Sequence, residues 1–260
     1  MQLFRFATVL VLSALVGFST AFPMNGSSTH ETDERHRLAT RGSPVPVGAV
    51  IDRCTVPGTV ALTFDDGPFI FTDKILNILR ANGVRATFFV TGQLHANIVN
   101  HGELVQRAIA EGHQVGSHTW GHPWLAGLDY GTIVGQMTQL ESAFLKVLGR
   151  FPTYMRPPFL AVDGVVLDAM SQLGYHVISA SIDTKDYEND DPVAIINSFN
   201  KFKAELNAGG TISLAHDVHR NTVDFLVQAM IDEVRARGLN PVPVGECLGD
   251  PPENWYRGAR

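Results

Sequence analysis

The hydrophobic pattern changes along the chain. From Thr59 onward, short apolar or β-branched runs alternate with longer segments of helical period. This alternation is typical of βα units that build a parallel sheet. About seven such units can be counted, and their predicted strands are Val60–Phe64, Ala86–Thr91, His113–Ser117, Thr153–Arg156, His176–Ile182, Thr211–Ala215 and Pro241–Val244.

Helices are expected between these strands. The clearest is the last of them, because its apolar residues recur at three- and four-residue spacing and Gly238 follows it. The first has Thr72 as its predicted N-cap and Gly83 as its end. The predicted helices are Asp73–Ala81, Asp129–Leu148, Asp191–Asn207 and Thr222–Arg237.

The number and spacing of these units indicate the fold class. Seven or eight βα units in about 200 residues favour an α/β fold, a deformed parallel (β/α) barrel with about seven strands. A doubly wound open sheet is less favoured because it would bring a glycine-rich phosphate turn, and we find none. In a barrel, the chemistry gathers at the carboxyl ends of the strands.

The first 48 residues differ from the rest of the chain. Residues 1–21 combine a basic start at Arg5, an apolar run over Ala7–Val16 and small residues up to Ala21, which predicts a secretory signal peptide. A membrane anchor is the alternative, but the apolar run is short for a bilayer. We therefore expect a secreted, extracellular protein that is not in the membrane after cleavage.

The chain divides into four predicted segments. The polar stretch 22–48 has no helical or strand period and is predicted to be a flexible lead or pro-segment. It contains a glycosylation pattern at Asn25, which is weak evidence by itself. The folded domain is predicted over residues 49–250, and a tail over residues 251–260.

Composition narrows the class of partner. The chain has 260 residues, 45% of them hydrophobic and 18% charged, which is enough for one sizeable core. The net charge is -6 and no block of Lys and Arg occurs, which argues against nucleic acid and anionic membrane surfaces. We expect a monomer.

The chain has two cysteines, and they flank the predicted strands. Cys54 precedes the first strand and Cys247 follows the last one. In an oxidising compartment such a pair usually forms a disulfide. Metal ligation by the two thiolates is the poorer alternative, since neither has a second Cys or a closely spaced His beside it.

Ionisable residues recur at the predicted strand ends. A single Asp there is most often a helix N-cap, and a single His is most often a packing residue. Five of the seven strand ends, however, carry ionisable groups of complementary kind, which favours a common site. These groups are Asp65, Asp66, His118, His122, Arg156, Asp183, Asp186 and His216.

The two histidines of HTWGH suggest a metal site. His118 and His122 are four residues apart, a spacing that often holds a divalent metal. The Glu of an HExxH helix is missing, and Gly121 and Pro123 favour a short irregular turn. One aspartate of TFDDGP would complete a site of two His and one carboxylate, typical of catalytic zinc.

The remaining polar groups fit around such a metal. One aspartate of TFDDGP would be the ligand and its neighbour the general base, because a cation allows both to stay ionised. Arg156 is a fixed cation that could hold the base in place. His216 would act as general acid, with Asp186 fixing its orientation and raising its pKa.

Five motifs occur in the order that is typical of one enzyme family. They are TFDDGP (63–68), HTWGH (118–122), RPPF (156–159), DTKDY (183–187) and LAH (214–216). In these motifs the chain resembles the polysaccharide deacetylase family, also called NodB-like or carbohydrate esterase family 4, and within it the fungal chitin deacetylases. The resemblance spans about Cys54 to Cys247.

The resemblance implies metal-dependent hydrolysis of the N-acetyl groups of N-acetylglucosamine residues in chitin or chitooligosaccharides, with zinc as the metal and cobalt as the alternative. It implies that Asp65 is the base, that Asp66, His118 and His122 are the metal ligands, that Arg156 orients Asp65, that His216 is the acid supported by Asp186, and that the Phe159 backbone N–H completes an oxyanion hole.

Three aromatic residues are candidates for contact with the substrate. Phe159 stands where the family more often has Tyr, and Tyr187 where it more often has Trp, which affects the expected substrate packing. Trp124 and Tyr187 could contact sugar rings, although Trp124 could equally be a packing residue. Two alternatives stay open, namely deacetylation of peptidoglycan or acetylxylan, and non-catalytic binding of chitin.

Overall fold

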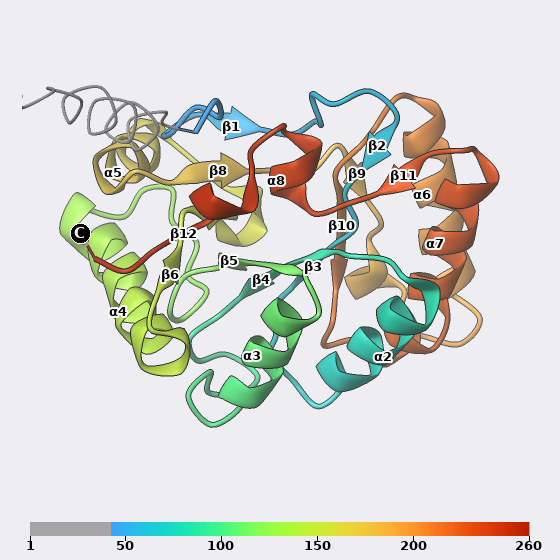
Figure 1. Cartoon of the computed structure of the whole chain (residues 1–260), viewed down its shortest axis with the longest axis horizontal. Helices are drawn as coiled ribbons and strands as arrows, with labels where there is room; N and C mark the ends of the chain where they lie inside the picture. The colour runs from blue at the N-terminus through green and yellow to red at the C-terminus, as the bar shows by residue number, and fades with distance from the viewer. Residues whose placement is uncertain (1–42, 260) are drawn as a thin grey trace, which may run out of the picture. The chain divides into compact units, whose positions relative to one another are not determined.

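The computed structural model describes residues 43–259. The predicted signal peptide, the glycosylation pattern at Asn25 and residues 22–42 of the predicted lead lie outside this range. The described chain is built on a sheet of eight parallel strands in the order β1-β8-β7-β5-β4-β3-β10-β9 (Figure 1). These strands are β1 Val50–Ile51, β3 Thr63–Asp65, β4 Thr87–Val90, β5 Gln114–Ser117, β7 Tyr154–Met155, β8 His176–Ile178, β9 Ile182–Asp183 and β10 Ser213–His216.

Helices surround this sheet (Figure 1). The α-helices are α2 Thr72–Asn82, α3 Gly102–Ala110, α4 Tyr130–Leu148, α5 Gly164–Leu173, α6 Ile195–Asn207, α7 Val227–Ala236 and α8 Val244–Cys247. Shorter turns are η1 Pro158–Leu160, η2 Asp186–Glu188, η3 Thr222–Leu226 and η4 Pro252–Asn254. Two small ladders pair β2 Thr59–Val60 with β11 Asn240–Pro241, and β6 Phe151–Pro152 with β12 Tyr256–Arg257. Among the described residues, no helix has both the length and the apolar character needed to cross a membrane.

The short stretch of chain between β8 and β9 connects the two sides of the sheet. The predicted strand His176–Ile182 is split into β8, which pairs with β7, and β9, which pairs with β10. Between them, the Ser179 N–H bonds to the Ile51 carbonyl and the Ser181 N–H bonds to the Ile212 carbonyl. The sheet therefore curls almost onto itself, and the predicted deformed parallel barrel is confirmed.

Several element boundaries differ from the prediction. Thr72 is the first residue inside α2 and not its N-cap, which is Phe71. The predicted strand Pro241–Val244 ends at Pro241, and Val244 begins α8. The predicted helix over Thr222–Arg237 starts with the π-helical turn η3 before α7. These corrections all concern residues whose neighbours come from distant parts of the chain.

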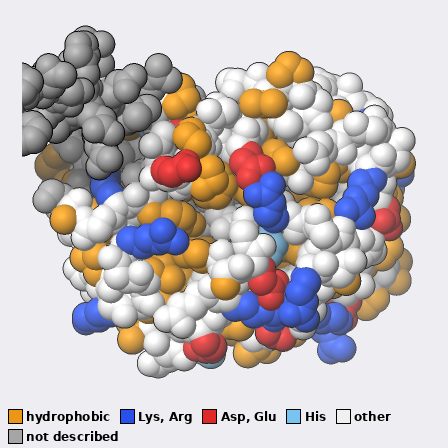
Figure 2. Space-filling view, viewed as in Figure 1, with side chains coloured by type: hydrophobic (Ala, Val, Ile, Leu, Met, Phe, Trp, Pro, Cys, Tyr) orange, Lys and Arg blue, Asp and Glu red, His pale blue; other side chains and the backbone are white. Residues whose placement is uncertain are grey.

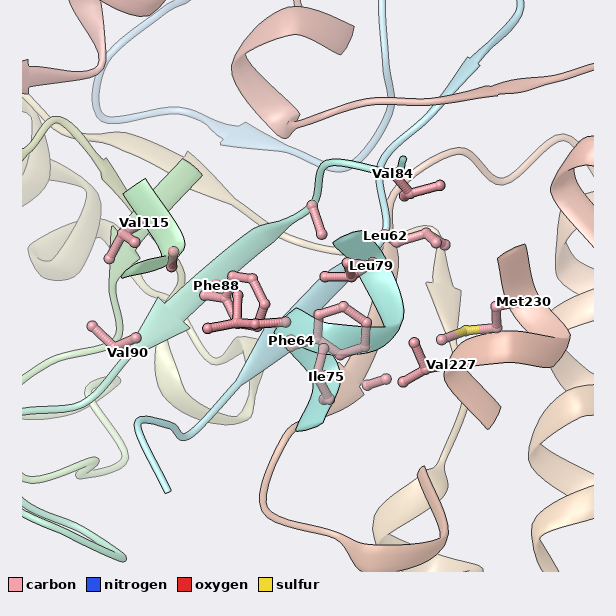
Figure 3. Close-up of a cluster of buried hydrophobic side chains, with 14 of the residues drawn as sticks. Leu62, Phe64, Ile75, Leu79, Val84, Phe88, Val90, Val115, Val227 and Met230 are labelled. Atoms are coloured by element: carbon pink, nitrogen blue, oxygen red, sulfur yellow. The ribbon is translucent and has the colours of Figure 1, made fainter. Parts of the chain in front are cut away.

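The largest hydrophobic cluster of the described residues packs helices α2, α3, α4, α6 and α7 against the sheet, and Figure 3 shows the part near α2 and α7. Phe64 of β3 and Phe88 of β4 have ring centroids 5.4 Å apart. Ile75 and Leu79 of α2 and Met230 of α7 are fully buried in the same cluster. Each buried side chain of this size contributes about 1.5–3 kcal/mol, so this cluster holds the strands that carry the polar loops.

Both ends of the predicted domain extend further than the sequence indicated. Val45 is buried, and the Pro46 carbonyl lies 2.9 Å from Nδ1 of His176, so residues 45–46 belong to the folded domain and not to a flexible lead. In the predicted tail, Trp255 is buried and β12 pairs with β6. The boundaries predicted at residues 49 and 250 are therefore too narrow.

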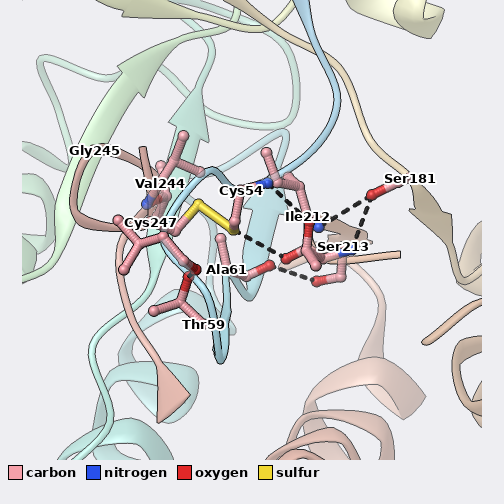
Figure 4. The surroundings of a disulfide bond; sticks show 12 residues. Cys54, Thr59, Ala61, Ser181, Ile212, Ser213, Val244, Gly245 and Cys247 are labelled. Carbon is pink, nitrogen blue, oxygen red and sulfur yellow. Dashed lines mark hydrogen bonds between the residues drawn. A yellow bond between two sulfur atoms is a disulfide. The ribbon is translucent and has the colours of Figure 1, made fainter. Parts of the chain in front are cut away.

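The two cysteines form the predicted disulfide (Figure 4). It joins Cys54 and Cys247, whose Cα atoms are 4.9 Å apart and which are separated by 193 residues in sequence. The backbone N–H of Cys54 donates to Oγ1 of Thr211, 2.8 Å away, just before β10. The disulfide therefore fastens α8 to the segments that lead into the sheet.

Charged side chains of both signs are interspersed on the molecular face that Figure 2 shows. Lys and Arg side chains lie beside Asp and Glu at several places on its described part. Among the ion pairs of the described chain are Arg107 with Asp73 and Arg85 with Glu246. Exposed pairs of this kind contribute little each, about 0–1 kcal/mol.

Candidate active site

The two aspartates of TFDDGP lie at the carboxyl end of β3. Asp65 is the last residue of the strand, and its side chain is almost completely buried. Asp66 follows with a left-handed backbone, φ 78°. Its N–H bonds to the Phe89 carbonyl of β4 at 3.2 Å. A non-glycine residue rarely adopts this conformation, so the surrounding contacts must hold the loop.

Asp66, His118 and His122 come together as a cluster of possible metal ligands. Oδ1 of Asp66 lies 3.5 Å from Nε2 of His118 and 3.4 Å from Nε2 of His122. One ligand atom from each residue lies within 4.8 Å of the others. Oδ1 of Asp66 is buried and has no hydrogen-bond partner among the described residues. A cation at this point would satisfy it.

The two histidines have the protonation and orientation that a metal ligand needs. Burial lowers the pKa of His118 to about 3 and that of His122 to about 4, so both rings are neutral. Nδ1 of His118 is bonded to the Arg156 carbonyl at 2.7 Å, which leaves Nε2 for the cluster. Two neutral imidazoles and one carboxylate fit a divalent metal ion.

The loop that carries these histidines is an irregular turn, as predicted. Thr119 and His122 both have left-handed backbones, with φ 68° and 56°. The His122 N–H donates to Oγ1 of Thr119 at 3.1 Å, which ties the turn together. The turn brings the second imidazole back to the end of β5.

Arg156 holds Asp65 in a buried ion pair. Nη1 of Arg156 lies 2.8 Å from Oδ1 of Asp65. The guanidinium is fully buried, donates from Nη2 to the Ser179 carbonyl at 2.9 Å and lies over the Phe89 ring. Burial raises the pKa of Asp65, and the charge of Arg156 opposes that rise. The other carboxylate oxygen, Oδ2, is 3.7 Å from Nε2 of His118 and so faces the ligand cluster.

His216 and Asp186 form a second buried pair. Nδ1 of His216 lies 2.8 Å from Oδ1 of Asp186. Asp186 is held in turn by the His216 backbone N–H and by the Thr222 hydroxyl, each 2.7 Å from its Oδ2. Burial alone would lower the pKa of His216, but Asp186 raises it to about 9. His216 is therefore protonated at neutral pH and can donate a proton.

Asp65, the three possible metal ligands and His216 line one pocket of about 340 Å³. Phe159 and Tyr187 line it, and the Tyr187 hydroxyl donates to Oδ2 of Asp183 at 3.1 Å. Trp124 does not line the pocket but stacks on Phe159, with ring centroids 5.4 Å apart. The lining residues are Asp65, Asp66, His118, His122, Pro157, Phe159, Leu160, Asp183, Tyr187, Leu214, His216 and His219.

The structure therefore brings the predicted site residues together. Arg156 and Asp186 lie behind the pocket wall and act through the residues they bind. His219 and Leu160 are lining residues to which the sequence assigned no role. His219 follows His216 by only three residues, which is a weak signal, and an apolar residue such as Leu160 gives no chemical signal at all.

The arrangement suits hydrolysis. A ligand cluster for a divalent cation lies beside a buried carboxylate that can accept a proton, and a protonated imidazole lines the same pocket. A poor electrophile such as an amide requires these groups together, since it needs an activated water, charge stabilisation and a proton for its leaving group.

Comparisons with known proteins agree with this geometry. The family model for polysaccharide deacetylase matches residues 52–178. A chitin deacetylase of Pestalotiopsis sp is 54% identical over 217 residues, which are 84% of this chain and 72% of that protein. A probable peptidoglycan-N-acetylglucosamine deacetylase of Arthroderma benhamiae is 51% identical over 214 residues, which are 82% of this chain but only 49% of that protein.

A solved structure shows the same fold. The chitin deacetylase from the fungal pathogen Colletotrichum lindemuthianum superposes with a TM-score of 0.81 and is 48% identical. The match covers 83% of this chain and 98% of that chain. From the motifs, the curled parallel sheet and these similarities, the chain belongs to the polysaccharide deacetylase family.

Proposed function

We propose that this protein is a secreted, metal-dependent chitin deacetylase that removes N-acetyl groups from N-acetylglucosamine residues of chitin or chitooligosaccharides. The observation that carries the proposal is the pocket that joins the ligand cluster to the Asp65–Arg156 and His216–Asp186 pairs. The names of two similar proteins, both chitin deacetylases, support the substrate. The signal-like residues 1–21 support secretion.

Asp66, His118 and His122 would hold the metal. When bound, a divalent metal supplies Lewis acidity that activates water and polarises the acetyl carbonyl. The donor set of two imidazoles and one carboxylate favours zinc, and cobalt(II) accepts the same ligands. The buried oxygen Oδ1 of Asp66, which has no hydrogen-bond partner within residues 43–259, supports this assignment.

Asp65 acts as the general base. It accepts a proton from the water whose oxygen attacks the acetyl carbonyl carbon. Arg156 keeps Oδ1 of Asp65 in place, so that Oδ2 is left to face the pocket. The negative charge that develops on the carbonyl oxygen would be stabilised in part by the backbone N–H of Phe159.

His216 acts as the general acid. The carbon–nitrogen bond of the acetamide breaks, and His216 gives its proton to the departing nitrogen, which leaves as the amine of a glucosamine residue. The acetyl group leaves as acetate. Asp186 keeps His216 protonated until this step, and Thr222 keeps Asp186 in position.

A second substrate is supported by one observation. The similar Arthroderma benhamiae protein is named as a probable peptidoglycan-N-acetylglucosamine deacetylase. Peptidoglycan carries the same acetamido group on N-acetylglucosamine, so the reaction would be unchanged and only the sugar neighbours would differ. A substrate panel separates the two polymers.

The test is acetate release by the metal-loaded protein from chitin tetramer to hexamer, peptidoglycan and acetylxylan, with and without a chelator. We expect release from the chitin oligomers, its loss with chelator and its return with zinc or cobalt. His101→Ala, which changes a half-buried histidine outside the pocket, is the matched control for His118→Ala. No release from any chitin oligomer by the metal-loaded protein would refute the proposal.

A further inference from the structure

One buried acidic residue beside the pocket has no part in the proposed chemistry. Asp217 follows His216 at the end of β10 and is fully buried. Its carboxylate accepts one hydrogen bond on Oδ2, from the Thr72 hydroxyl at 2.5 Å. The other oxygen, Oδ1, has no hydrogen-bond partner among residues 43–259. A buried carboxyl with one partner destabilises the fold, which calls for a physical reason.

The Asp217 carboxylate lies directly against the backbone of the metal-ligand loop. A Cβ atom on Gly67 would lie 2.2 Å from Oδ2 and 2.7 Å from Oδ1 of Asp217. Only glycine therefore fits at residue 67, and it is the residue that directly follows Asp66. The same aspartate also donates its backbone N–H to the Asp65 carbonyl at 3.3 Å.

The loop is held on its other side by Thr91. The Thr91 N–H donates to the Gly67 carbonyl at 2.9 Å, and its hydroxyl donates to the Asp66 carbonyl at 3.2 Å. The backbone of Asp66 and Gly67 is thus enclosed between Thr91, which follows β4, and Asp217, which follows β10. Because Asp66 has a left-handed backbone, this enclosure maintains a conformation that it would rarely adopt alone.

Thr72 extends the support to the far end of the loop. Its hydroxyl oxygen accepts the Phe69 N–H at 2.8 Å while its proton goes to Asp217. One carboxylate therefore stabilises the loop at two points, at Gly67 by direct contact and at Phe69 through Thr72. This explains why Thr72 is turned toward β10 at the start of α2.

We propose that Asp217 is a positioning residue for the metal ligand Asp66. By contact with Gly67 and by its hydrogen bond to Thr72, it holds the loop so that Oδ1 of Asp66 faces His118 and His122. The inference rests on the proposed function, in which these three residues bind a divalent metal. Supporting residues around metal ligands typically change metal affinity by about 10- to 100-fold when they are removed.

The experiment measures zinc and cobalt affinity of the purified apoprotein by competition with a chelator, together with the melting temperature. Asp217→Ala removes both the contact and the hydrogen bond, so we expect affinity to fall by about tenfold or more. Asp217→Asn keeps the shape and an acceptor for Thr72, so we expect it to restore affinity to within about threefold of the unchanged protein. Asp224→Asn is the matched control, because Asp224 lies nearby in sequence but pairs with Lys74 at the surface.

A purely structural role would lower the melting temperature without changing metal affinity. The inference is therefore overturned if folded Asp217→Ala binds metal within about twofold of the unchanged protein, or if Asp217→Asn is as weak as Asp217→Ala. Should Asp217→Ala fail to fold, Thr72→Val tests the same support by removing only the hydroxyl link. We then expect a smaller loss of metal affinity, and unchanged affinity in folded Thr72→Val would overturn the inference.

The result can be separated from a failure of the proposed function. If the unchanged apoprotein binds neither zinc nor cobalt, the metal-dependent function itself fails, and this inference fails with it. If the unchanged protein binds metal and releases acetate but the Asp217 variants bind metal equally well, only this inference fails. In the active variants we expect kcat to fall and KM for chitin oligomers to stay unchanged, since Asp217 does not line the pocket.

Discussion

The two ends of strand β7 lie in different environments. At its amino end, Tyr154 is packed into the hydrophobic cluster around Trp255, and its hydroxyl donates to Oδ2 of Asp250 at 2.7 Å. Just past its carboxyl end, Arg156 is buried against Asp65 beside the pocket. The amino end is dominated by apolar packing, with the buried carboxyl of Asp250 hydrogen-bonded to Tyr154, whereas the carboxyl end holds the Asp65–Arg156 ion pair beside the pocket.

The carboxyl ends of the strands also hold the backbone strain. Within residues 43–259, all six non-glycine residues with positive φ lie in loops that follow β3, β5, β7 and β9. Such residues cost roughly 1–3 kcal/mol each and persist where their surroundings hold them. They are Asp66, Thr119, His122, Phe159, Leu160 and Lys185.

The amino ends are closed by residues from the end of the domain. The N–H groups of Val244 and Gly245, in α8, donate to the side chains of Thr87 and Gln114, which begin β4 and β5. Any side chain at Gly245 would collide with the Trp255 ring, 2.1 Å from the position of its Cβ. Packing at the amino ends of the strands therefore stabilises the fold. This stability offsets the cost of the buried charges and left-handed residues at the carboxyl ends.

The largest expected effect comes from removing a metal ligand at the pocket end. His118→Ala should abolish metal binding and lower acetate release by about 1,000-fold or more, because water activation is lost. Its melting temperature without metal should fall below that of His101→Ala, because His118 is buried and bonded to the Arg156 carbonyl, so metal content is compared at a temperature where both variants are folded. Acetate release and metal content of the two variants measure this. Metal binding that survives in His118→Ala would contradict the ligand assignment.

The next effect concerns the amino end of the sheet. Replacing both Cys54 and Cys247 by Ser should lower the free energy of unfolding by about 2–5 kcal/mol, because the closed loop between them is long. At a temperature where the variant is folded, kcat and KM should match those of the unchanged protein. Denaturant unfolding and kinetics are the measurements. An unchanged free energy of unfolding would show that the disulfide does not stabilise this end.

The pH profile tests the His216–Asp186 pair. His216 must be protonated to donate, and its pKa is raised to about 9, so activity should be present below that pH and fall as pH rises through it. Its contribution to stability has the same sign, present below its ordinary pKa and lost as pH rises through about 9. Asp186→Asn should move the alkaline limb of kcat to lower pH. If the alkaline limb of Asp186→Asn stays at the pH of the unchanged protein, His216 is not the general acid.

The smallest effect is expected at the rim of the pocket. Trp124 is 58% exposed and stacks on Phe159, which is 59% exposed. Aromatic contacts of this kind contribute about 0.5–1.5 kcal/mol, so Trp124→Ala should raise KM for chitin pentamer about threefold and leave kcat nearly unchanged. The KM of Trp124→Phe should lie between the values for the unchanged protein and for Trp124→Ala. Equal KM values in all three proteins would make Trp124 a simple packing residue.

Much of the pocket could be predicted because its chemistry is local in sequence. The spacing of His118 and His122, the adjacent aspartates of TFDDGP and the position of each group at a strand end all point to one site. The structure places these groups around one pocket, with Arg156 and Asp186 behind its wall. The roles assigned to them stay predictions until they are tested by mutation.

The parts that could not be predicted depend on distant contacts. Thr72 has the sequence signature of an N-cap, but its hydroxyl serves Asp217, which is 145 residues away. The break between β8 and β9 follows from pairing with β1 and β10 on either side, which a continuous apolar run does not reveal. The burial of Trp255 likewise depends on its fit against Gly245.

The most direct test of the account compares Asp65→Asn with Asp66→Asn, measuring metal content and acetate release from chitin pentamer for both. The two neighbouring carboxylates have different proposed roles, Asp65 as base and Asp66 as metal ligand. Asp65→Asn should keep its metal and lose acetate release by about 1,000-fold, whereas Asp66→Asn should lose the metal itself. Near-normal release by Asp65→Asn, or undiminished metal binding by Asp66→Asn, would contradict the account.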